Sequence, residues 1–379
     1  MRISRRGLIA LAVTGISVTM ASGVAGSADA APVRPTVTSF GMAGGLNGAA
    51  AVSNGSAWAV GYAGKSSVPR VLLLRWNGTA WSRVTSPSVL TAVGELTAVT
   101  AVSSTSAWAV GYTGRLGTGK NHSLLLHWNG TVWSEVTNPA PVTGGSLAAV
   151  TTKAKNGWAV GYVNTNPSAP LCCAGTPLVL RWDGARWSRS ATKLGKGSYL
   201  NGVAITTANV TWGIGGPLAM ITGALARFSS GTWSWVADPV RGAYRPLNGI
   251  AAGPAGTAVM VGTDNDAPLG PPVSARWNGK AWRQVTVTAP KLSQLNAVAF
   301  APGGTAWAAG GSPAGGTLNP MIMRWNGKTW VRVTVPGKGE ELNGLAFSAA
   351  GYGWAVGSTS SASGSPRTVI LHWNGKAWS

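Results

Sequence analysis

The sequence repeats itself seven times, and this repetition restricts the possible folds more than any other feature. The motif Trp-Asn-Gly-x-x-Trp begins at Trp76, Trp128, Trp182, Trp277, Trp325 and Trp373, with Asp183 replacing Asn in one copy and a variant from Phe228 to Trp233. Successive copies start roughly 50 residues apart, a period that is typical of solenoids and propellers.

Two landmarks precede each copy of this motif. The first is Trp-Ala-Val-Gly or a close variant, beginning at Trp58, Trp108, Trp158, Trp212, Val259, Trp307 and Trp354. The second is a leucine, at Leu46, Leu96, Leu147, Leu200, Leu247, Leu295 and Leu342. Of the 20 tryptophans, all except Trp235 fall in the three columns that these motifs define. The architecture therefore explains the tryptophan content without a ligand site lined by tryptophan.

Each repeat is expected to form four short strands. The first starts at the leucine and is rich in small residues, as in 247–251, and the second carries Trp-Ala-Val-Gly. The third is strongly apolar, as in 71–76, and the fourth starts at the last tryptophan, as in 81–85. Asn-Gly between strands three and four is a strong hairpin signal. A two-residue turn there would set Leu74 opposite Trp81.

Four-stranded units of about 50 residues, repeated around an axis, form β-propeller blades. A linear solenoid is the alternative, but the repeats lack a polar capping copy. We therefore expect an all-β, seven-bladed β-propeller of four-stranded blades. The last copy reaches Ser379 within its fourth strand, and Thr36-Val37-Thr38 precedes Leu46 at the spacing of Val333 from Leu342. This N-terminal strand segment is expected to complete the last blade and to close the ring.

The first 30 residues are expected to be an export signal peptide. Arg2, Arg5 and Arg6 precede an apolar stretch, and Ala28-Asp29-Ala30 is a small-x-small cleavage site. The run from Ser4 to Leu8 also resembles the twin-arginine signal, and a plain secretory signal is the equal alternative. Residues 31–379 then form a single propeller domain. No later apolar stretch reaches about 18 residues, so no transmembrane helix is expected.

Charge indicates which partners such a chain attracts. The formal net charge is +21, although only 10% of the residues are charged. A basic exported protein attracts anionic polysaccharides and wall polymers, whereas nucleic acid is not expected as a specific partner. The simpler interpretation is a basic solvated surface without a specific partner. The chain is expected to be an extracellular monomer, secreted or associated with the cell wall.

The repeats resemble the Trp-rich propeller repeats of secreted actinobacterial proteins, and they are distantly kelch-like. The resemblance covers residues 36–379 and rests on Trp-Asn-Gly-x-x-Trp and Trp-Ala-Val-Gly. It implies the fold and export, and it implies no chemistry.

Groups that could carry chemistry are few. The adjacent Cys172 and Cys173 could form a vicinal disulfide, remain free thiols, or link to another chain. Asp264 and Asp266 share a loop and are weak candidates for a cation site. Glu340 and Glu341 are expected in a solvated loop. No Cys–His or Ser–His–Asp arrangement is visible, and no cofactor is expected.

Two repeated polar columns have both a structural and a functional interpretation. A basic residue precedes each third-column aromatic residue, at Arg75, His127, Arg181, Arg227, Arg276, Arg324 and His372. These cations would stack on tryptophan rings, which we favour, or form a ring for an anionic ligand. Asparagine follows the landmark leucine at Asn47, Asn201, Asn248, Asn296 and Asn343. These amides should lie at a mouth of the central channel, where they would tie down incoming loops or bind a ligand.

These observations favour an exported, non-catalytic binding module for an anionic glycan, a cell-wall polymer or a protein partner. The alternatives are a hydrolase or lyase acting on extracellular polysaccharide, and a structural surface protein. The segments between strands two and three vary most between repeats, and they should share a face with the connections between blades. That face, with Arg115, Lys120 and the amide ring, is expected to bind the ligand.

Overall fold

The computed structural model describes residues 41–116, 119–139, 143–164, 175–207, 210–217, 224–240, 245–265, 270–359 and 365–379. These residues belong to the second of two compact units, Met1–Thr36 and Val37–Ser379. The export signal, Thr36-Val37-Thr38, Cys172, Cys173 and Asp266 lie outside the described residues. No helix in the described part is long and apolar enough to cross a membrane.

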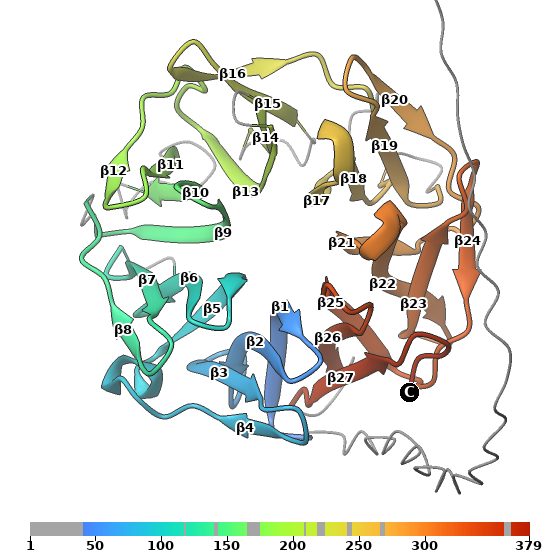
Figure 1. Ribbon diagram of the computed structural model, residues 1–379, viewed down its shortest axis with the longest axis horizontal. Coiled ribbons are helices and arrows are strands. Elements are labelled where there is room, and N and C mark those ends of the chain that lie inside the picture. Colours follow the sequence, from blue (N-terminus) through green and yellow to red (C-terminus); the bar gives the residue numbers. More distant parts are fainter. Residues whose placement is uncertain are drawn as a thin grey trace, which may run out of the picture. The chain divides into compact units, whose positions relative to one another are not determined.

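Seven antiparallel sheets stand around a central axis, which confirms the seven-bladed β-propeller (Figure 1). In each sheet the strands follow one another in chain order, and the first strand of each lies nearest the axis. Six of the described sheets have four strands and the last has three.

The strands are grouped by blade. Blade 1 contains β1 (Gly44–Ser53), β2 (Ser56–Ala63), β3 (Arg70–Trp76) and β4 (Trp81–Arg83). Blade 2 contains β5 (Gly94–Ser103), β6 (Ser106–Thr113), β7 (His122–Trp128) and β8 (Trp133–Glu135). Blade 3 contains β9 (Gly145–Lys153), β10 (Asn156–Asn164), β11 (Gly175–Trp182) and β12 (Trp187–Arg189). Blade 4 contains β13 (Ser198–Thr207), β14 (Val210–Pro217), β15 (Ala224–Ser229) and β16 (Thr232–Val236).

Blade 5 contains β17 (Leu247–Ala252), β18 (Ala258–Gly262), β19 (Val273–Trp277) and β20 (Trp282–Val285). Blade 6 contains β21 (Gln294–Phe300), β22 (Ala306–Ala314), β23 (Thr317–Trp325) and β24 (Trp330–Val333). Blade 7 contains β25 (Glu340–Phe347), β26 (Gly353–Thr359) and β27 (Thr368–Trp373). Three short 3₁₀ helices, η1 (Ser88–Thr91), η2 (Pro254–Gly256) and η3 (Pro302–Gly304), lie in connections.

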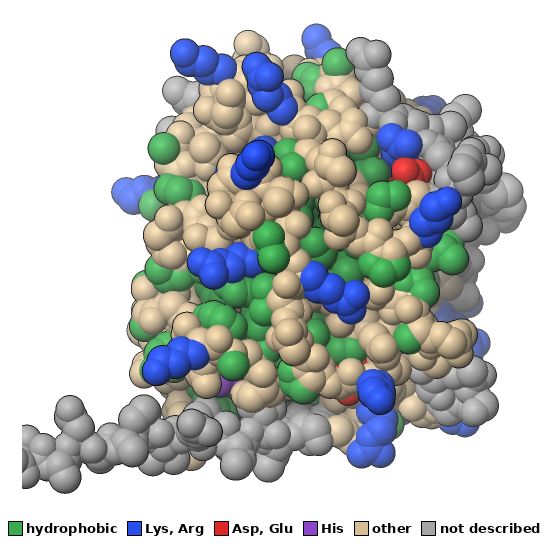
Figure 2. Space-filling model, turned by 90° about the vertical axis from the view of Figure 1, so that its right-hand side faces the viewer, with side chains coloured by type: hydrophobic (Ala, Val, Ile, Leu, Met, Phe, Trp, Pro, Cys, Tyr) green, Lys and Arg blue, Asp and Glu red, His purple; other side chains and the backbone are tan. Residues whose placement is uncertain are grey.

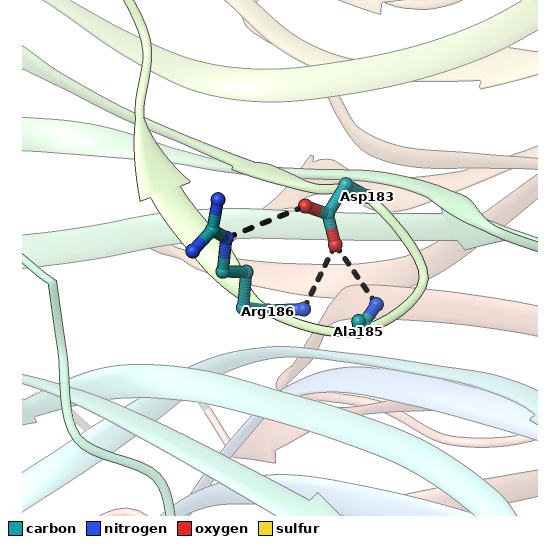
Figure 3. Close-up of polar contacts among 3 residues, drawn as sticks. All are labelled: Asp183, Ala185 and Arg186. Carbon is teal, nitrogen blue, oxygen red and sulfur yellow. Dashed lines mark hydrogen bonds and ion pairs between the residues drawn. The ribbon is translucent and has the colours of Figure 1, made fainter.

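The turn between strands three and four is wider than the Asn-Gly signal predicts. Trp76 pairs directly with Trp81, and Leu74 pairs with Arg83, so the expected two-residue turn is wrong. The Asn77 side-chain oxygen accepts the backbone N–H groups of Thr79 and Ala80, both at 2.9 Å. Asp183 does the same in blade 3 with Ala185 and Arg186, as Figure 3 shows. The motif therefore selects Asn or Asp because its side chain caps a four-residue turn.

A β-bulge at the residue after the landmark leucine explains the glycine of Trp-Ala-Val-Gly. In blade 1, Leu46 pairs with Gly61 and Gly48 pairs with Val60, so Asn47 is the extra residue. The same register shift occurs in the first strand of every blade. A Cβ added to Gly61 would overlap the carbonyl oxygen of Gly45, and the equivalent glycines meet the same obstacle. Glycine therefore allows the two backbones to approach at the bulge.

The tryptophan columns meet at the junctions between blades. Trp58 of blade 1 packs against Trp128 and Trp133 of blade 2, each at 5.0 Å between ring centroids. The same arrangement joins blade 7 to blade 1, where Trp354 contacts Trp76 and Trp81 at 4.8 and 5.0 Å. Perpendicular ring pairs of this kind are a favourable aromatic geometry. Each tryptophan cluster thus fastens two neighbouring blades.

The basic column stacks on these rings, which confirms the structural interpretation. The Arg75 guanidinium lies 5.5 Å from the Trp58 ring centre and 5.1 Å from that of Trp128. His127 and His372 lie 4.1 and 4.4 Å from Trp108 and Trp354. The remaining cations of the column are stacked in the same way: Arg181, Arg227, Arg276 and Arg324. The arginines stabilise the tryptophan clusters by cation–π contact. Burial lowers the pKa of His127 and His372, so these two rings stack as neutral imidazoles.

Blade 7 meets both ends of the described chain. Trp378 pairs with Trp373, and Ser379 exchanges two hydrogen bonds with His372, so the C-terminus begins the fourth strand. On the N-terminal side, the N–H of Thr368 donates to the carbonyl oxygen of Met42 at 2.9 Å. The N–H of Gly44 donates to the carbonyl oxygen of Pro366 at 2.7 Å. Completion of this strand by residues 36–38 stays a prediction.

Candidate functional site

The central channel is the natural starting point for a site because all seven first strands line it. Its cavity of about 200 Å³ is bordered by the five repeated asparagines and by small residues such as Gly48, Ala98 and Gly344. The placement of the amides at the channel is therefore confirmed. The bulges position the amides, because an extra residue turns its side chain toward the neighbouring strand.

The asparagines form a hydrogen-bonded belt that links the first strands around the channel. The amide nitrogen of Asn47 donates to the carbonyl oxygen of Leu96 in the next blade at 2.9 Å. Four more asparagines donate in the same way, from Asn201 to Leu247, Asn248 to Leu295, Asn296 to Leu342 and Asn343 to Leu46. The hydroxyl of Thr97 supplies the bond to Leu147 at 2.8 Å. The last of these bonds runs from blade 7 to blade 1, so the belt crosses the ring closure.

The belt changes the interpretation of the amide ring. The nitrogens are engaged with neighbouring first strands, rather than with incoming loops as the structural interpretation expected. Ala148 occupies the position in blade 3 and carries no donor, so the belt lacks a bond to Leu200 there. Ligand binding by Asn47, Asn201, Asn248, Asn296 and Asn343 stays a prediction.

A second group of polar side chains lies at the mouth of the channel beside Asn47. We call Tyr62, Glu95, Tyr112 and Tyr162 the tyrosine–glutamate cluster. Glu95 directly precedes the landmark Leu96, and its carboxylate accepts the Asn47 amide at 2.6 Å and the Tyr112 hydroxyl at 3.2 Å. Tyr112 is the residue paired with Glu95 across β5 and β6, so both side chains lie on one face of the sheet. The cluster is thus built by blades 1, 2 and 3.

Burial and mutual repulsion determine the acidity of this cluster. Burial raises the pKa of Glu95, while hydrogen bonds from Asn47 and Tyr112 lower it. Burial also raises the pKa of Tyr62 and Tyr112, and the nearby Glu95 carboxylate raises both further. Tyr162 raises the pKa of Tyr112 too and has a raised pKa from its own burial. The phenols therefore stay neutral near neutral pH and can donate hydrogen bonds.

Sequence reasoning missed this cluster. The available signal was Gly-Tyr after Ala-Val in three consecutive repeats, at Tyr62, Tyr112 and Tyr162. The remaining blades have Gly216, Thr263, Gly311 and Ser358 at this position. Tyrosine at this position is therefore confined to blades 1, 2 and 3, and blade 4 carries Tyr199 on the opposing strand.

A second carboxylate lies at the same mouth, in a blade that has Ser358 in place of the tyrosine. Glu341 of β25 accepts the amide of Asn296 at 2.8 Å and that of Gln294 at 2.5 Å. Burial raises its pKa. Glu340 and Glu341 begin a strand and are partly buried, so their expected place in a solvated loop is wrong. Glu341 is connected to the belt because the amide that it accepts, Asn296, belongs to the preceding blade.

The other predicted site residues do not join this cluster by any described contact. Arg115 and Lys120 are exposed on the segment between β6 and β7, and their role in binding stays a prediction. The carboxylate of Asp264 is held by Arg245 through two contacts of 3.1 and 3.2 Å. Since Asp266, Cys172 and Cys173 lie outside the described residues, the cation site and the vicinal disulfide stay predictions.

The remaining described acids have local roles or none that is apparent. Asp183 caps its turn, and these backbone hydrogen bonds lower its pKa. Asp238 accepts the N–H of Val240 at 2.8 Å, and burial raises its pKa to about 6. Within the described ranges, no three His, Cys, Asp or Glu side chains gather as they would around a metal ion.

Comparison with known proteins finds similar folds and no similar sequences. The sequence matches no protein-family model and no curated protein. The structure is similar to YCF48 bound to a D1 peptide, with a TM-score of 0.55, 13% identity, and coverage of 86% of this chain and 92% of that one. It is similar to YCF48 from Cyanidioschyzon merolae, with a TM-score of 0.55, 15% identity, and coverage of 88% and 96%.

The WD40 β-propeller domain of Doa1 is also similar, with a TM-score of 0.54, 10% identity, and coverage of 88% and 94%. At these identities the likeness shows the shared propeller fold alone. The chain is thus a Trp-rich, seven-bladed β-propeller whose candidate site lies at one mouth of its channel.

Proposed function

We propose that this chain is an exported, non-catalytic binding module that holds a protein partner on the face of the β2–β3 loops and their equivalents. The observation that carries the proposal is the tyrosine–glutamate cluster at the channel mouth. The repeated tryptophans and cations are engaged in blade junctions, whereas this cluster is confined to three blades. A polar and aromatic group that breaks the symmetry of a repeat scaffold indicates a binding surface.

The face itself supports the same proposal. The connections between blades run beside the starts of the third strands, since Val93 bridges to Arg70 and Thr143 to His122. The segments between second and third strands reach the same face and differ in length from blade to blade. Tyr62, Tyr112 and Tyr162 lie near the ends of the second strands, so their side chains border these segments.

A structure with the same fold illustrates the mode of binding by analogy. YCF48 was solved bound to a D1 peptide. Fold likeness does not transfer a ligand, so the analogy supports only that a propeller of this kind can present a peptide-binding face. The signal-like residues 1–30 place the partner outside the cell in this proposal.

The non-catalytic part of the proposal rests on how five of the described carboxylates are used. Glu95 and Glu341 are bound by belt amides, Asp183 and Asp238 cap backbone N–H groups, and Asp264 pairs with Arg245. General acid–base catalysis needs a carboxyl that reaches a reacting group. A polysaccharide hydrolase or lyase is the competing proposal, and it requires turnover of a polymer.

Surface charge favours a second candidate, an anionic glycan or wall polymer. Figure 2 shows Lys and Arg side chains spread over one side of the molecule, with hydrophobic side chains between them. Together with the net charge of +21, this distribution favours long-range attraction of polyanions. Attraction of this kind weakens steeply as salt is raised.

Loop replacement separates these candidates. Immobilised protein is offered extracellular proteins, wall fractions and polysaccharides, and each retained component is purified and its affinity measured across a salt series. We expect a protein partner whose binding is lost when residues 115–120 and 164–174 are replaced by Gly-Ser linkers. The control changes Lys280, Lys328 and Lys376 to Glu on the opposite face.

Three outcomes contradict the proposal. Retained affinity after loop replacement places the site elsewhere. Loss in the lysine variant alone, with a steep salt dependence, favours the polyanion. Release of shortened polymer indicates an enzyme.

A further inference from the structure

A carboxyl group without a described cationic partner lies at the mouth of the channel. In a chain of net charge +21, Glu95 has no Lys or Arg ion-pair partner among the described residues, where the ion pairs are Arg186–Asp183 and Arg245–Asp264. Its hydrogen bonds come from an amide and a phenol, which are both neutral donors. Neutral donors hold the carboxylate in place and leave its charge uncompensated.

Tyr112 and Tyr62 lie close to the same carboxylate, and Tyr162 lies close to Tyr112. Tyr112 is 5% exposed and is fixed by its bond to Glu95, while Tyr62 and Tyr162 are half-buried. Of the three phenols, only that of Tyr112 forms a hydrogen bond with a described residue. Tyr62 packs over Gly45, where a Cβ would lie within 3.2 Å of the ring. Glycine at this position therefore gives the Tyr62 ring its place beside the channel.

We propose that the tyrosine–glutamate cluster is an anchor for a cationic group, namely a lysine ammonium or arginine guanidinium of the partner protein. This inference rests on the proposed function and names the chemistry of its contact. A carboxylate supplies the counter-charge, and aromatic rings attract a cation through their π-faces. The hydroxyls of Tyr62 and Tyr162 accept hydrogen bonds from the same donor group.

Glu341 provides an internal comparison. It lies at the same mouth and is also bound by a belt amide and has a neutral second donor, Gln294. Blades 1 to 3 carry tyrosine after the glycine of the second strand. At this position the blade of Glu341 has Ser358, blade 6 on one side has Gly311, and blade 1 on the other side has Tyr62. A cation attracted to charge alone would use both carboxylates, whereas an anchor built from charge and aromatic faces uses Glu95.

The experiment measures small cationic probes against the purified protein. Nα-acetyl-lysine amide and Nα-acetyl-arginine amide are titrated and followed by saturation-transfer NMR, and Nα-acetyl-norleucine amide is the uncharged analogue. We expect the cationic probes to bind at least about tenfold more tightly than the norleucine probe. Glu95→Gln should weaken the lysine probe by about tenfold or more, and Glu341→Gln should leave its affinity within about twofold.

The salt dependence of affinity is a second readout. Added salt weakens the binding of a polyanion, but it should not weaken the binding of the cationic probe. The remaining net charge of the protein repels a cationic probe over a long range, and added salt screens that repulsion. Contact with a half-buried carboxylate is screened much less. We therefore expect the lysine probe to bind at least as tightly at about 0.15 M salt as at about 0.01 M.

Four results would overturn the anchor: no saturable binding of either cationic probe, equal binding of the norleucine probe, an unchanged affinity in Glu95→Gln, or equal loss in Glu341→Gln. Each leaves the proposed function standing if loop replacement still abolishes partner binding. Conversely, if the probes bind as expected but loop replacement does not affect partner binding, the proposed function is wrong and the cluster remains a cation site.

Discussion

At the scale of single residues, each tryptophan of the repeat serves the boundary between two blades. Trp133 belongs to β8 of blade 2, yet it packs perpendicular to Trp58 of blade 1 at 5.0 Å. It also lies 6.0 Å from Trp128 in its own hairpin. Only 1% of its surface is exposed. A change at this residue therefore acts on the contact between blades.

Replacing Trp133 with alanine tests this role. We expect Trp133→Ala to lower the free energy of unfolding by about 3–5 kcal/mol, as for a buried aromatic residue truncated in a packed core. The adjacent Val132 is 42% exposed, so Val132→Ala should change it by less than about 0.5 kcal/mol. Urea unfolding measures both variants. Equal stability of the two would show that this tryptophan column does not hold the blades together.

The residue scale also shows what sequence reasoning could and could not provide. Ring stacking of the basic column is predictable from the sequence, because all seven repeats carry a basic residue before the third-column aromatic residue. The turn register was wrong because the Asn77 side chain replaces a backbone partner and widens the turn. The role of Glu95 was missed because its amide partner is Asn47, which lies 48 positions away along the chain. A bulge that redirects Asn47 toward the next blade leaves no local pattern in the sequence.

At the scale of elements, six of the seven neighbouring pairs of innermost strands are joined by a side-chain bond of the same kind. These bonds run from a bulged residue to the carbonyl of the next landmark leucine, as from Asn201 to Leu247 at 2.9 Å. The belt is interrupted where Ala148 replaces the donor, although Ala148 lines the same cavity. The sequence predicted the position of the amides correctly, since their spacing follows the repeat. It could not predict their partners, because the arrangement of neighbouring blades decides them.

Two substitutions test the belt in opposite directions. Asn201→Ala should lower the free energy of unfolding by about 1 kcal/mol, because it removes one hydrogen bond between blades 4 and 5. Ala148→Asn should raise it by up to about 1 kcal/mol, because it supplies the missing donor toward Leu200. Chemical denaturation of both proteins provides the measurement. A destabilised Ala148→Asn variant would mean that the bulge does not direct this side chain to the next blade.

At the scale of the whole molecule, seven similar blades must close into a ring, and the last contact joins the two ends of the chain. The Trp354 cluster and the bond from Asn343 to Leu46 connect blade 7 to blade 1. Among the described residues, no fourth strand longer than the Trp378 bridge covers the outer side of β27. There a cavity of about 320 Å³ is lined by Val369, Leu371 and Ser379, with Gly41 at its border. In blade 6 the corresponding strand edge is covered by β24.

The sequence predicts which segment fills this edge. Val37 stands nine positions before Leu46, just as Val333 stands nine positions before Leu342. The Arg367 side chain donates to the Gly41 carbonyl beside β27, and the N–H of Thr368 in β27 donates to the Met42 carbonyl. We expect deletion of residues 32–40 to lower the melting temperature of the ring by about 5 °C or more, because it leaves a strand edge and apolar side chains uncovered. Deletion of residues 1–31 should leave the melting temperature unchanged. A Gly-Ser segment of equal length in place of residues 32–40 separates strand pairing from chain length. If that segment restores the melting temperature fully, or if the deletion never lowers it, residues 36–38 do not complete blade 7.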